Sequence, residues 1–324
     1  MSEPLLRVER LSKYFPVRGG LFRRARGWLK AVDEVSFEVP RGHTFGLVGE
    51  SGCGKSTLGR AILRLHEPTA GRVVLDGMDI TALDPKALTA ARRHMQIVFQ
   101  DPYASLSPRR TVLQTLLEPM EVHRLGTPRS RRDKVVELLD IVGLGPEVLH
   151  RYPHEFSGGQ RQRIGIARAL TLEPKFIVAD EAVSALDVSV QSQVLNLISR
   201  LQRELGISFL FISHDLAVVQ HISHRVGVMY LGRLVEVAPA EDLYRDPRHP
   251  YTRALLSAVP VPEPGRRRRR IVLQGEVPSP LHPPSGCPFH TRCPEAEPEC
   301  ARIRPGLEPV HDGGAPHLVA CLHR

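Results

Sequence analysis

Short apolar segments alternate with helical stretches over most of the chain. The segments SFEV (36–39) and TFGLVG (44–49) are rich in β-branched and aromatic residues, and the second leads through glycines into KSTLGRAILRL, which is the order strand, turn, helix. Two further apolar runs, KFIVAD (175–180) and ISFLFIS (207–213), flank the helical pattern of residues 189–205. Because alternating strands and helices form buried parallel sheets, the pattern predicts an α/β fold with a mostly parallel sheet.

The pattern changes twice along the chain. Residues 101–156 contain helical stretches such as RRDKVVELLDIVGL, which predicts an inserted helical subdomain. Sixteen of the 28 prolines lie from residue 239 onward, and proline disfavours long helices and central strands. We therefore expect one large domain over residues 1–240 and a small Pro/Cys-rich extension over residues 241–324.

The composition is that of a globular protein, with 42% apolar and 24% charged residues. No apolar run approaches the length of a membrane-spanning helix, and the N-terminus lacks the basic start and apolar run of a signal peptide. We therefore expect the chain to stay in the cytosol. Disulfides are rare there, so clustered cysteines indicate metal ligands or redox groups.

The formal net charge of +9 invites a nucleic-acid function. However, the concentrated basic runs are short and lie at residues 23–26, 129–132 and 266–270. We interpret each run as a solvated surface or linker. A sharper alternative is contact with an anionic membrane surface.

A phosphate-binding loop is indicated by GESGCGKST, which fits G-x-x-x-x-G-K-[ST] from Gly49 to Ser56. The glycines let backbone N–H groups turn inward around phosphates, Lys55 reaches the terminal phosphates, and Ser56 is placed for Mg²⁺ at a helix N-terminus. The motif follows an apolar strand and precedes a helix, which is the context that its function requires.

Two acids follow the apolar run FIVAD. Asp180 ends that strand, where a carboxylate can hold the water shell of a metal ion opposite Ser56. Glu181 comes next and is suited to orient the attacking water or to accept its proton. With the phosphate loop, these acids predict a hydrolytic site.

A second phosphate-binding helix end is predicted by FSGGQRQRIGIARAL, residues 156–170. Ser157 and two glycines open this helix, and the free N–H groups of its first turn can bind an anion. One chain needs only one such end for its own nucleotide. The second one implies two nucleotide domains that face each other, each closing the ATP site of the other.

In this order, over about residues 5–240, these motifs resemble the nucleotide-binding subunits of ABC transporters. The resemblance implies a P-loop NTPase core that uses ATP and Mg²⁺. It implies that Phe15, or Tyr14 beside it, stacks on adenine, and that Gln100 and His214 contact the γ-phosphate. Phe156 stands where leucine is more usual in the signature motif. The catalytic residues implied are Glu181, His214 and Gln100. The nucleotide-binding residues implied are Phe15, Tyr14, Gly49, Ser51, Gly52, Gly54, Lys55, Ser56, Thr57, Asp180, Ser157, Gly158, Gly159, Gln160 and Asp187, with Ser56, Gln100 and Asp180 toward Mg²⁺.

Four of the five cysteines lie in the extension, with the spacing C-x5-C-x6-C-x20-C. They are Cys287, Cys293, Cys300 and Cys321. Four thiolates suit zinc or an iron–sulfur cluster, and a metal could supply folding free energy to a segment with little core. The absence of tight C-x2-C pairs favours a cluster over a single zinc ion. The alternative is four unpaired surface thiols.

The tail narrows the resemblance further. RDPRHPYTRALLSAVPVP, GEVPSP and GCPFHTRCP are similar to the C-terminal extension of dipeptide/oligopeptide importer ATPases. VRGGLFRRARGWLKAVD and QDPYASLSPRRTV resemble the "F"-type subunit of these importers. The resemblance implies a 4Fe–4S cluster on the four cysteines, with zinc as the alternative.

The same resemblance implies a function and partners. The function is ATP hydrolysis that powers the import of dipeptides or oligopeptides. The partners are a second, homologous ATPase in a heterodimer, two integral membrane permeases and, indirectly, an external peptide-binding protein, with no nucleic acid. The chain would lie peripherally at the cytoplasmic face of the cell or inner membrane, held by the permeases.

Two other functions stay open at this stage. One is a non-transport ABC ATPase that acts on nucleic acid and carries a structural zinc site. The other is a regulatory module in which the cluster senses redox state or iron. The sequence does not select the solute, and the import direction comes from the resemblance alone.

Overall fold

Two compact units make up the described part of the chain. The computed structural model describes residues 3–19, 24–259, 271–310 and 316–323. Within these ranges, the first unit consists of residues 3–5, 39–43 and 82–212, and the second of residues 6–38, 44–81 and 213–323. The basic run at 266–270 lies outside the described residues. Of the basic run at 23–26, Arg23 is outside the described residues and the side chains of residues 24–26 are not described.

A parallel sheet lies at the centre of the first unit. Its strand order is β8-β7-β6, and Phe176 is in register with both Met95 and Ser208. All residues of β7 and β8 are buried, which explains why these strands are continuous apolar runs in the sequence. The strands predicted at 175–180 and 207–213 are thus confirmed. The bounds are β6 (Met95–Val98), β7 (Phe176–Asp180) and β8 (Ser208–Ile212).

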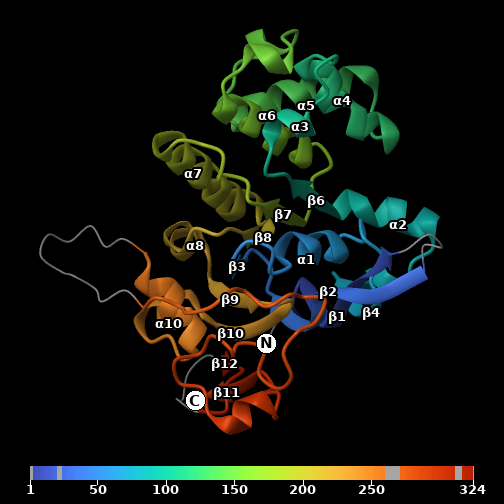
Figure 1. Cartoon of the computed structure of the whole chain (residues 1–324). Helices are drawn as coiled ribbons and strands as arrows, with labels where there is room; N and C mark the ends of the chain where they lie inside the picture. The colour runs from blue at the N-terminus through green and yellow to red at the C-terminus, as the bar shows by residue number, and fades with distance from the viewer. Residues whose placement is uncertain (1–2, 20–23, 260–270, 311–315, 324) are drawn as a thin grey trace, which may run out of the picture. The chain divides into compact units, whose positions relative to one another are not determined.

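The helices of the first unit begin at side-chain caps. Thr111, Thr127 and Ser157 each accept an N–H bond from the third residue of the helix that follows. Helices α3 to α6 gather in one cluster (Figure 1), and α3 to α5 lie within residues 101–156, where the subdomain itself stays a prediction. The bounds are α2 (Pro85–Ala91), α3 (Pro102–Ser105), α4 (Val112–Val122), α5 (Pro128–Ile141), α6 (Gly158–Leu170) and α7 (Val188–Leu205).

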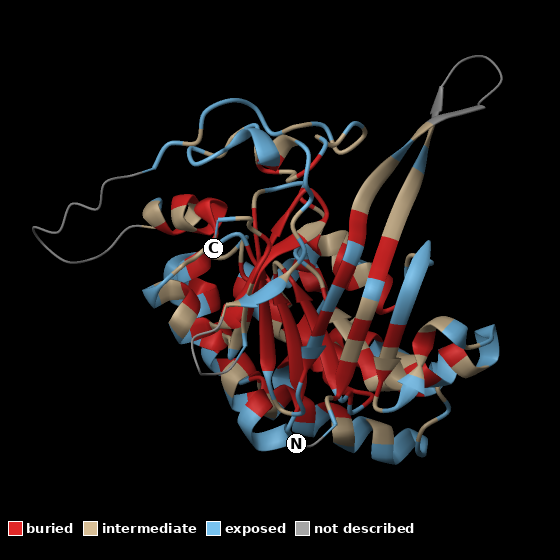
Figure 2. Cartoon of the chain, turned by 90° about the horizontal axis from the view of Figure 1, so that it is seen from below, coloured by how far each residue is buried: buried red, intermediate tan, exposed pale blue. Residues whose placement is uncertain are grey.

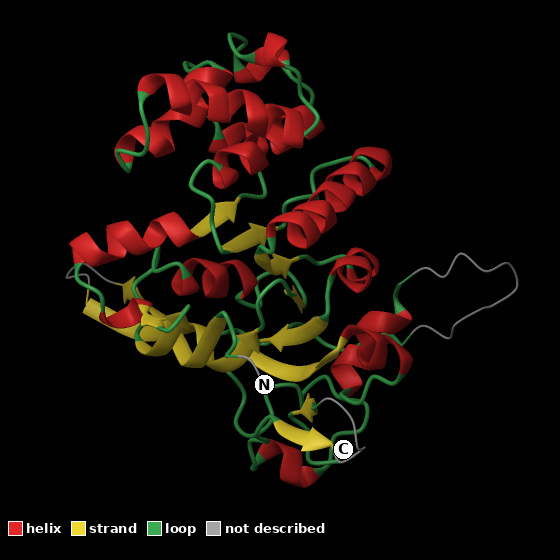
Figure 3. Cartoon of the chain, turned by 180° about the vertical axis from the view of Figure 1, so that it is seen from behind, coloured by secondary structure: helices red, strands yellow, loops and turns green. Residues whose placement is uncertain are grey.

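Two strand assemblies form the second unit (Figure 3). One is an antiparallel sheet of order β2-β1-β4-β5. The other has the order β11-β12-β10-β9-β3, in which β3 and β9 are parallel and the remaining neighbours antiparallel. The bounds are β1 (Leu6–Gly19), β2 (Arg24–Val39), β3 (Thr44–Val48), β4 (Ala70–Leu75), β5 (Met78–Asp79), β9 (Arg225–Tyr230), β10 (Arg233–Pro239), β11 (Glu308–Val310) and β12 (His317–Val319).

Short helices accompany these strands. In the described residues after 240, no helix is longer than the eight residues of α10, as the proline content predicts. The bounds are α1 (Lys55–Ile62), α8 (Leu216–Ile222), α9 (Ala240–Arg245) and α10 (Pro250–Ser257). Single 3₁₀ turns cover Ile80–Ala82, Arg92–His94, Pro146–Val148, Pro153–Glu155 and Pro298–Ala301.

Within the second unit, a buried carboxylate on strand β10 joins the extension to the strands. Glu236 on β10 is fully buried and accepts hydrogen bonds from the backbone N–H groups of Arg248 and His249, at 2.7 and 3.0 Å. His317 Nε2 on β12 lies 2.7 Å from Glu236 Oε1. Figure 2 shows the interior strands as buried and much of the tail as exposed. The few buried contacts at Glu236 thus connect a tail that has little core of its own. The predicted boundary at residue 240 stays a prediction.

Candidate functional site

The phosphate loop has the backbone geometry that its sequence requires. It leaves the buried strand β3 at Gly49 and enters helix α1 at Lys55. Gly54 has φ +108°, and a Cβ atom there would lie 2.0 Å from the carbonyl oxygen of Ala31. A side chain at residue 54 would therefore be both strained and blocked by backbone. Ser51 and Gly52 are exposed at the outside of the loop, and Ser56 and Thr57 are half-buried at the start of α1.

Lys55 is buried in the loop that it serves. Its Nζ donates hydrogen bonds to the carbonyl oxygens of Gly49 and Glu50, at 2.7 and 3.0 Å. The ammonium group thus lies on the concave side of the loop, where the inward-turned N–H groups of the motif bind phosphate.

Glu50, the second residue of the loop, is held by residues from the far end of the chain. Its backbone N–H donates to the hydroxyl of Tyr251 at 2.9 Å. Its carboxylate accepts two hydrogen bonds from Arg292, at 2.8 and 3.1 Å. Sequence reasoning missed all three residues, because no local motif links positions 242 residues apart.

The first unit brings Gln100 and Glu181 together. Gln100 Nε2 donates to Glu181 Oε2 at 2.8 Å. Asp180 is buried as the last residue of β7, and Glu181 directly after it has φ +49°. A left-handed glutamate costs free energy, and such backbone strain is common at functional sites. It turns the Glu181 side chain out of the strand direction and toward Gln100.

The helix end at Ser157 has the predicted cap. Ser157 Oγ accepts from the N–H of Gln160 at 3.3 Å, and Gln160 Oε1 accepts from the N–H of Ser157 at 3.0 Å. A Cβ atom at Gly159 would lie 2.2 Å from Val190 Cγ1, so this glycine is needed for packing against α7. Gly158 is exposed and its nearest neighbour would be at 3.5 Å. Phe156 is buried, so the unusual residue of the motif fills core space.

Asp187 and His214 precede helices. Asp187 accepts from the N–H of Val190 at 2.9 Å as the N-cap of α7, and this bond lowers the pKa of its carboxyl. His214 is exposed and lies directly before Asp215, the N-cap of α8. His214 and the phosphate loop belong to the second unit, whereas Gln100, Ser157, Asp180, Glu181 and Asp187 belong to the first.

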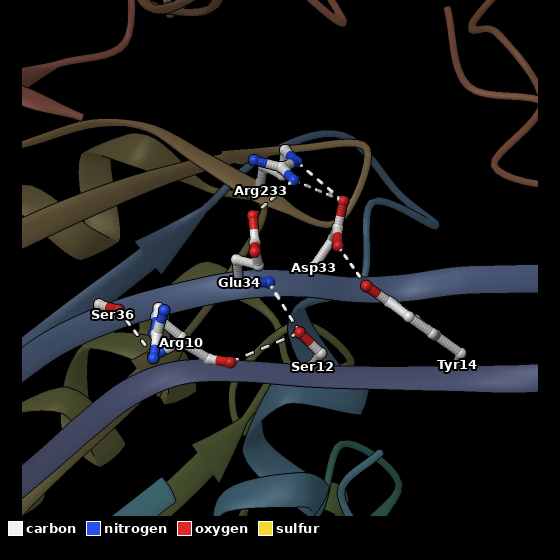
Figure 4. Close-up of polar contacts among 7 residues, drawn as sticks. All are labelled: Arg10, Ser12, Tyr14, Asp33, Glu34, Ser36 and Arg233. Carbon is white, nitrogen blue, oxygen red and sulfur yellow. Dashed lines mark hydrogen bonds and ion pairs between the residues drawn. The ribbon is translucent and has the colours of Figure 1, made fainter. Parts of the chain in front are cut away.

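The two candidates for adenine stacking differ in their surroundings, and Figure 4 shows those of Tyr14. The Tyr14 hydroxyl donates to Asp33 Oδ1 at 2.5 Å, and Asp33 also accepts from Arg233 Nε at 2.9 Å. Burial would raise the pKa of Asp33, but the Tyr14 and Arg233 bonds outweigh it and lower that pKa. Phe15 instead lies edge-on to His66, with Lys13 Nζ 4.9 Å from its ring centroid. Tyr14 is therefore part of a polar network that fixes its hydroxyl, whereas the Phe15 ring has no such tie.

Cys287, Cys293, Cys300 and Cys321 line one cavity of about 20 Å³ in the extension. That volume admits about one water molecule. Burial raises the pKa of three of these thiols, to about 11 for Cys293. The four side chains thus meet, but in an arrangement that suits neither a cluster nor a zinc ion.

The expected 4Fe–4S cluster, and the zinc ion given as its alternative, are wrong. Among the residues that the structure describes, no group of three or more histidine, cysteine, aspartate or glutamate side chains is arranged to hold a metal ion. All five cysteines are free, and Cys300 Sγ lies 3.6 Å from His323 Nε2. The spacing and the resemblance of the tail suggested ligands, but the folded tail leaves free thiols, of which Cys300 is buried and the other three are half-buried.

Within the same described ranges, no helix combines the length and apolar character needed to cross a bilayer.

Two family models match the chain. The model described as ABC transporter matches residues 32–184, and the model described as oligopeptide/dipeptide transporter, C-terminal region, matches residues 235–300. The motif-based resemblance and the resemblance of the tail are both confirmed by these matches.

Curated relatives are similar over nearly the whole chain. The putative oligopeptide transport ATP-binding protein YkfD of Bacillus subtilis (strain 168) is 57% identical over 321 residues, which covers 98% of this chain and 95% of that protein. The oligopeptide transport ATP-binding protein AppF of the same organism is 55% identical, covering 99% of this chain and 97% of its own. The similarity therefore includes the C-terminal extension.

Solved structures share the fold. The dimeric post-hydrolysis structure of the ATP-binding cassette MJ0796 bound to ADP and Pi has a TM-score of 0.64 and 28% identity, and the match covers 72% of this chain and 98% of that one. CbiO1 from Clostridium perfringens, described as part of an ABC transporter complex, has a TM-score of 0.65 and 26% identity, covering 76% of this chain and 92% of that one. The predicted P-loop core is thus confirmed.

Proposed function

This chain belongs to the ATP-binding subunits of ABC-type peptide transporters, and from that membership we propose how its residues power the import of dipeptides or oligopeptides. It is an ATPase, and its role as a subunit of a peptide importer gives it membrane permeases as partners. No contact or similarity described above favours the alternative function on nucleic acid, and the redox-sensing alternative required the cluster.

The phosphate loop is proposed to bind the phosphates of ATP. Lys55 exchanges its bonds to the loop carbonyls for bonds to the β- and γ-phosphates, and the N–H groups at the start of α1 add further donors. The hydroxyl, carboxylate and amide oxygens of Ser56, Asp180 and Gln100 are of the chemical type that Mg²⁺ prefers. When bound, Mg²⁺ neutralises charge on the phosphates. Phe15 is proposed to stack on adenine, because Tyr14 is tied to Asp33.

The hydrogen bond between Gln100 and Glu181 is the observation that carries the proposed chemistry. A general base must be oriented toward the attacking water whose proton it accepts. The Gln100 amide donates to Glu181 Oε2 and so orients the carboxylate that is proposed to accept the proton. The strained backbone at Glu181 and the buried strand before it fix where that oxygen lies. We assign the base to Glu181 and its orientation to Gln100, with His214 as a contact of the γ-phosphate.

The exposed helix end at Ser157 is proposed to act on the nucleotide of a second ATPase subunit. Ser157 and Gly158 are exposed at the start of this helix, and the first-turn N–H groups of a helix can bind an anion. We propose that ATP closes two homologous subunits head to tail, in a heterodimer, and that hydrolysis reopens them. The motion would reach the permeases through Gln100 and the helical segment after it.

The last part of the proposal concerns where this chain lies in the cell and how the peptide reaches the permeases. We propose that the permeases hold the chain at the cytoplasmic face of the cell membrane, and that an external binding protein delivers the peptide to the permeases. Both follow from the subunit role that the peptide transport relatives support.

The substitution Glu181→Gln tests the proposed chemistry in the assembled transporter. The change removes the base but keeps shape and hydrogen bonding, so ATP should stay bound while turnover falls by about 100-fold or more. Glu204→Gln, an equal change at an exposed residue of α7, is the control and should keep full activity. Steady-state ATPase rates and retained nucleotide are measured. Turnover of the Glu181 variant within two-fold of the parent protein would sink the assignment.

A further inference from the structure

The C-terminal extension contacts the phosphate loop through the side chains of Tyr251 and Arg292, and only Arg292 carries a charge. Arg292 lies between Cys287 and Cys300, in a turn held by the bonds Cys287 N–H to Cys300 O and Arg292 N–H to Phe289 O, at 2.7 and 3.0 Å. From this turn its guanidinium makes a two-point contact with the Glu50 carboxylate. All of these residues belong to the second unit.

The contact is buried on the arginine side. The Arg292 side chain is 7% exposed and that of Glu50 28% exposed. The guanidinium lies over the ring of Tyr230, with 5.9 Å from Cζ to the ring centroid. Tyr230, Tyr251 and Phe289 are fully buried and pack together with ring centroids 4.8 to 5.3 Å apart. A two-point arginine–carboxylate pair on such a base has little freedom to move.

The backbone of Glu50 does not depend on this ion pair. Its N–H is held by the Tyr251 hydroxyl, and its carbonyl oxygen accepts from Lys55. The loop therefore keeps its anchors if the carboxylate loses its partner. What the ion pair adds is charge compensation for the one acidic residue of GESGCGKST.

We propose that Arg292 is a positioning residue of the ATP site: it neutralises the Glu50 carboxylate and turns it away, so that the phosphate loop presents no uncompensated negative charge to the phosphates. The inference rests on the proposed binding of ATP phosphates by this loop. It gives the extension a part in nucleotide affinity, because the guanidinium comes from the tail and the carboxylate from the loop. An unpaired carboxylate near phosphate oxygens repels them, and in a partly buried site solvent screens this repulsion only in part.

Single and double variants separate charge compensation from a purely structural brace. Arg292→Gln should raise the Kd for ATP about ten-fold, which corresponds to about 1.4 kcal/mol. Glu50→Gln should bind ATP within about two-fold of the parent chain, and the double variant Arg292→Gln/Glu50→Gln should recover most of the lost affinity. Arg292→Lys, which keeps the charge without the two-point geometry, should fall between. Arg302→Gln, an exposed arginine of the same extension, is the matched control and should bind as the parent does.

The measurement is calorimetric titration of the full-length chain with ATP and Mg²⁺, at low and high salt, with melting temperatures recorded alongside. The affinity loss of Arg292→Gln should shrink at high salt, which a structural defect would not do. A double variant as weak as Arg292→Gln would overturn charge compensation, as would an Arg292→Gln chain that binds like the parent. A parent chain that fails to bind ATP would instead refute the proposed function of the loop.

Discussion

Single backbone positions in the phosphate loop decide whether it can form. Gly49 and Gly54 both have positive φ, and a Cβ atom at either would lie 2.0 to 2.2 Å from a carbonyl oxygen, of Met229 or Ala31. Gly52 has φ +78° with no atom within 4 Å of the position a Cβ would take. The motif glycines therefore have different reasons to be glycine. Two are required by close backbone contacts and one by conformation alone.

Gly54→Ala and Gly52→Ala should accordingly differ in their effects. Both pay about 1–2 kcal/mol for a left-handed alanine, but only the first also pushes a methyl group into backbone. We expect Gly54→Ala to lower the melting temperature clearly more than Gly52→Ala and to abolish ATP binding. Gly52→Ala should keep measurable binding. Thermal unfolding and ATP titration check this, and equal melting temperatures for the two variants would contradict the packing argument.

At the scale of elements, buried polar groups contribute to the attachment of the extension beside the aromatic cluster of Tyr230, Tyr251 and Phe289. His249 begins helix α10, and its Nδ1 accepts from the N–H of Tyr251 at 3.1 Å. The His249 ring is almost fully buried and lies against Phe289. The backbone N–H of His249 donates to the Glu236 carboxylate. Burial lowers the pKa of the His249 imidazole to about 4. A cap that accepts a hydrogen bond requires this neutral form.

Acid should therefore weaken this attachment. The unfolded chain binds a proton at His249 below about pH 6.5, but the folded chain resists it down to about pH 4. Stability is thus highest above pH 6.5 and falls as the pH drops toward 4, by about 3 kcal/mol from this group. His249→Asn keeps a cap acceptor but does not titrate. Melting temperatures measured from pH 7.5 to 4.5 should fall less steeply for it than for the parent protein.

An exposed histidine provides the control for that experiment. His221, in the last turn of α8, is solvent-exposed. His221→Asn should leave the dependence of melting temperature on pH unchanged. If His249→Asn were as acid-sensitive as the parent, the buried imidazole would not be the source of that sensitivity.

At the scale of the whole molecule, the chain carries a helix end that its own fold does not use. Ser157 caps α6 within the chain, yet it and Gly158 are exposed at a helix start suited to phosphate. Gly159 is needed for packing against Val190, so only part of the motif is explained by this chain alone. The exposed residues Ser157 and Gly158 are the ones that the proposed subunit pairing would use.

Ser157→Arg tests that pairing. The bulky cation should block the nucleotide site of the partner subunit while leaving the phosphate loop of its own chain intact. We expect ATP affinity of the isolated variant chain to equal that of the parent, and ATPase activity of the assembly with permeases and a second ATPase to fall by at least ten-fold. Calorimetry measures the ATP affinity of the isolated chain, and steady-state turnover measures the ATPase activity of the assembly. Full turnover in the assembly would exclude the proposed head-to-tail use of Ser157.

Features that depend on neighbouring residues followed from the sequence alone. The strands at 44–48, 176–180 and 208–212 are buried apolar runs, and the loop from Gly49 to Ser56 matches a local phosphate-binding motif between a strand and a helix. The cap at Ser157 likewise follows from its local motif. In each case the determining interactions span only a few residues, so the order of residues specifies them.

Features that join distant residues were decided only by the tertiary structure. The pair Glu50–Arg292 links positions 242 residues apart, and neither residue carries a periodic or local signal. The four cysteines were expected to bind a metal from their spacing and from the resemblance of the tail, but the packing of the tail leaves them as free thiols around a very small cavity. Charge pairing and ligand geometry depend on where side chains meet after folding, and that is set by the packing of the whole unit rather than by any stretch of the chain.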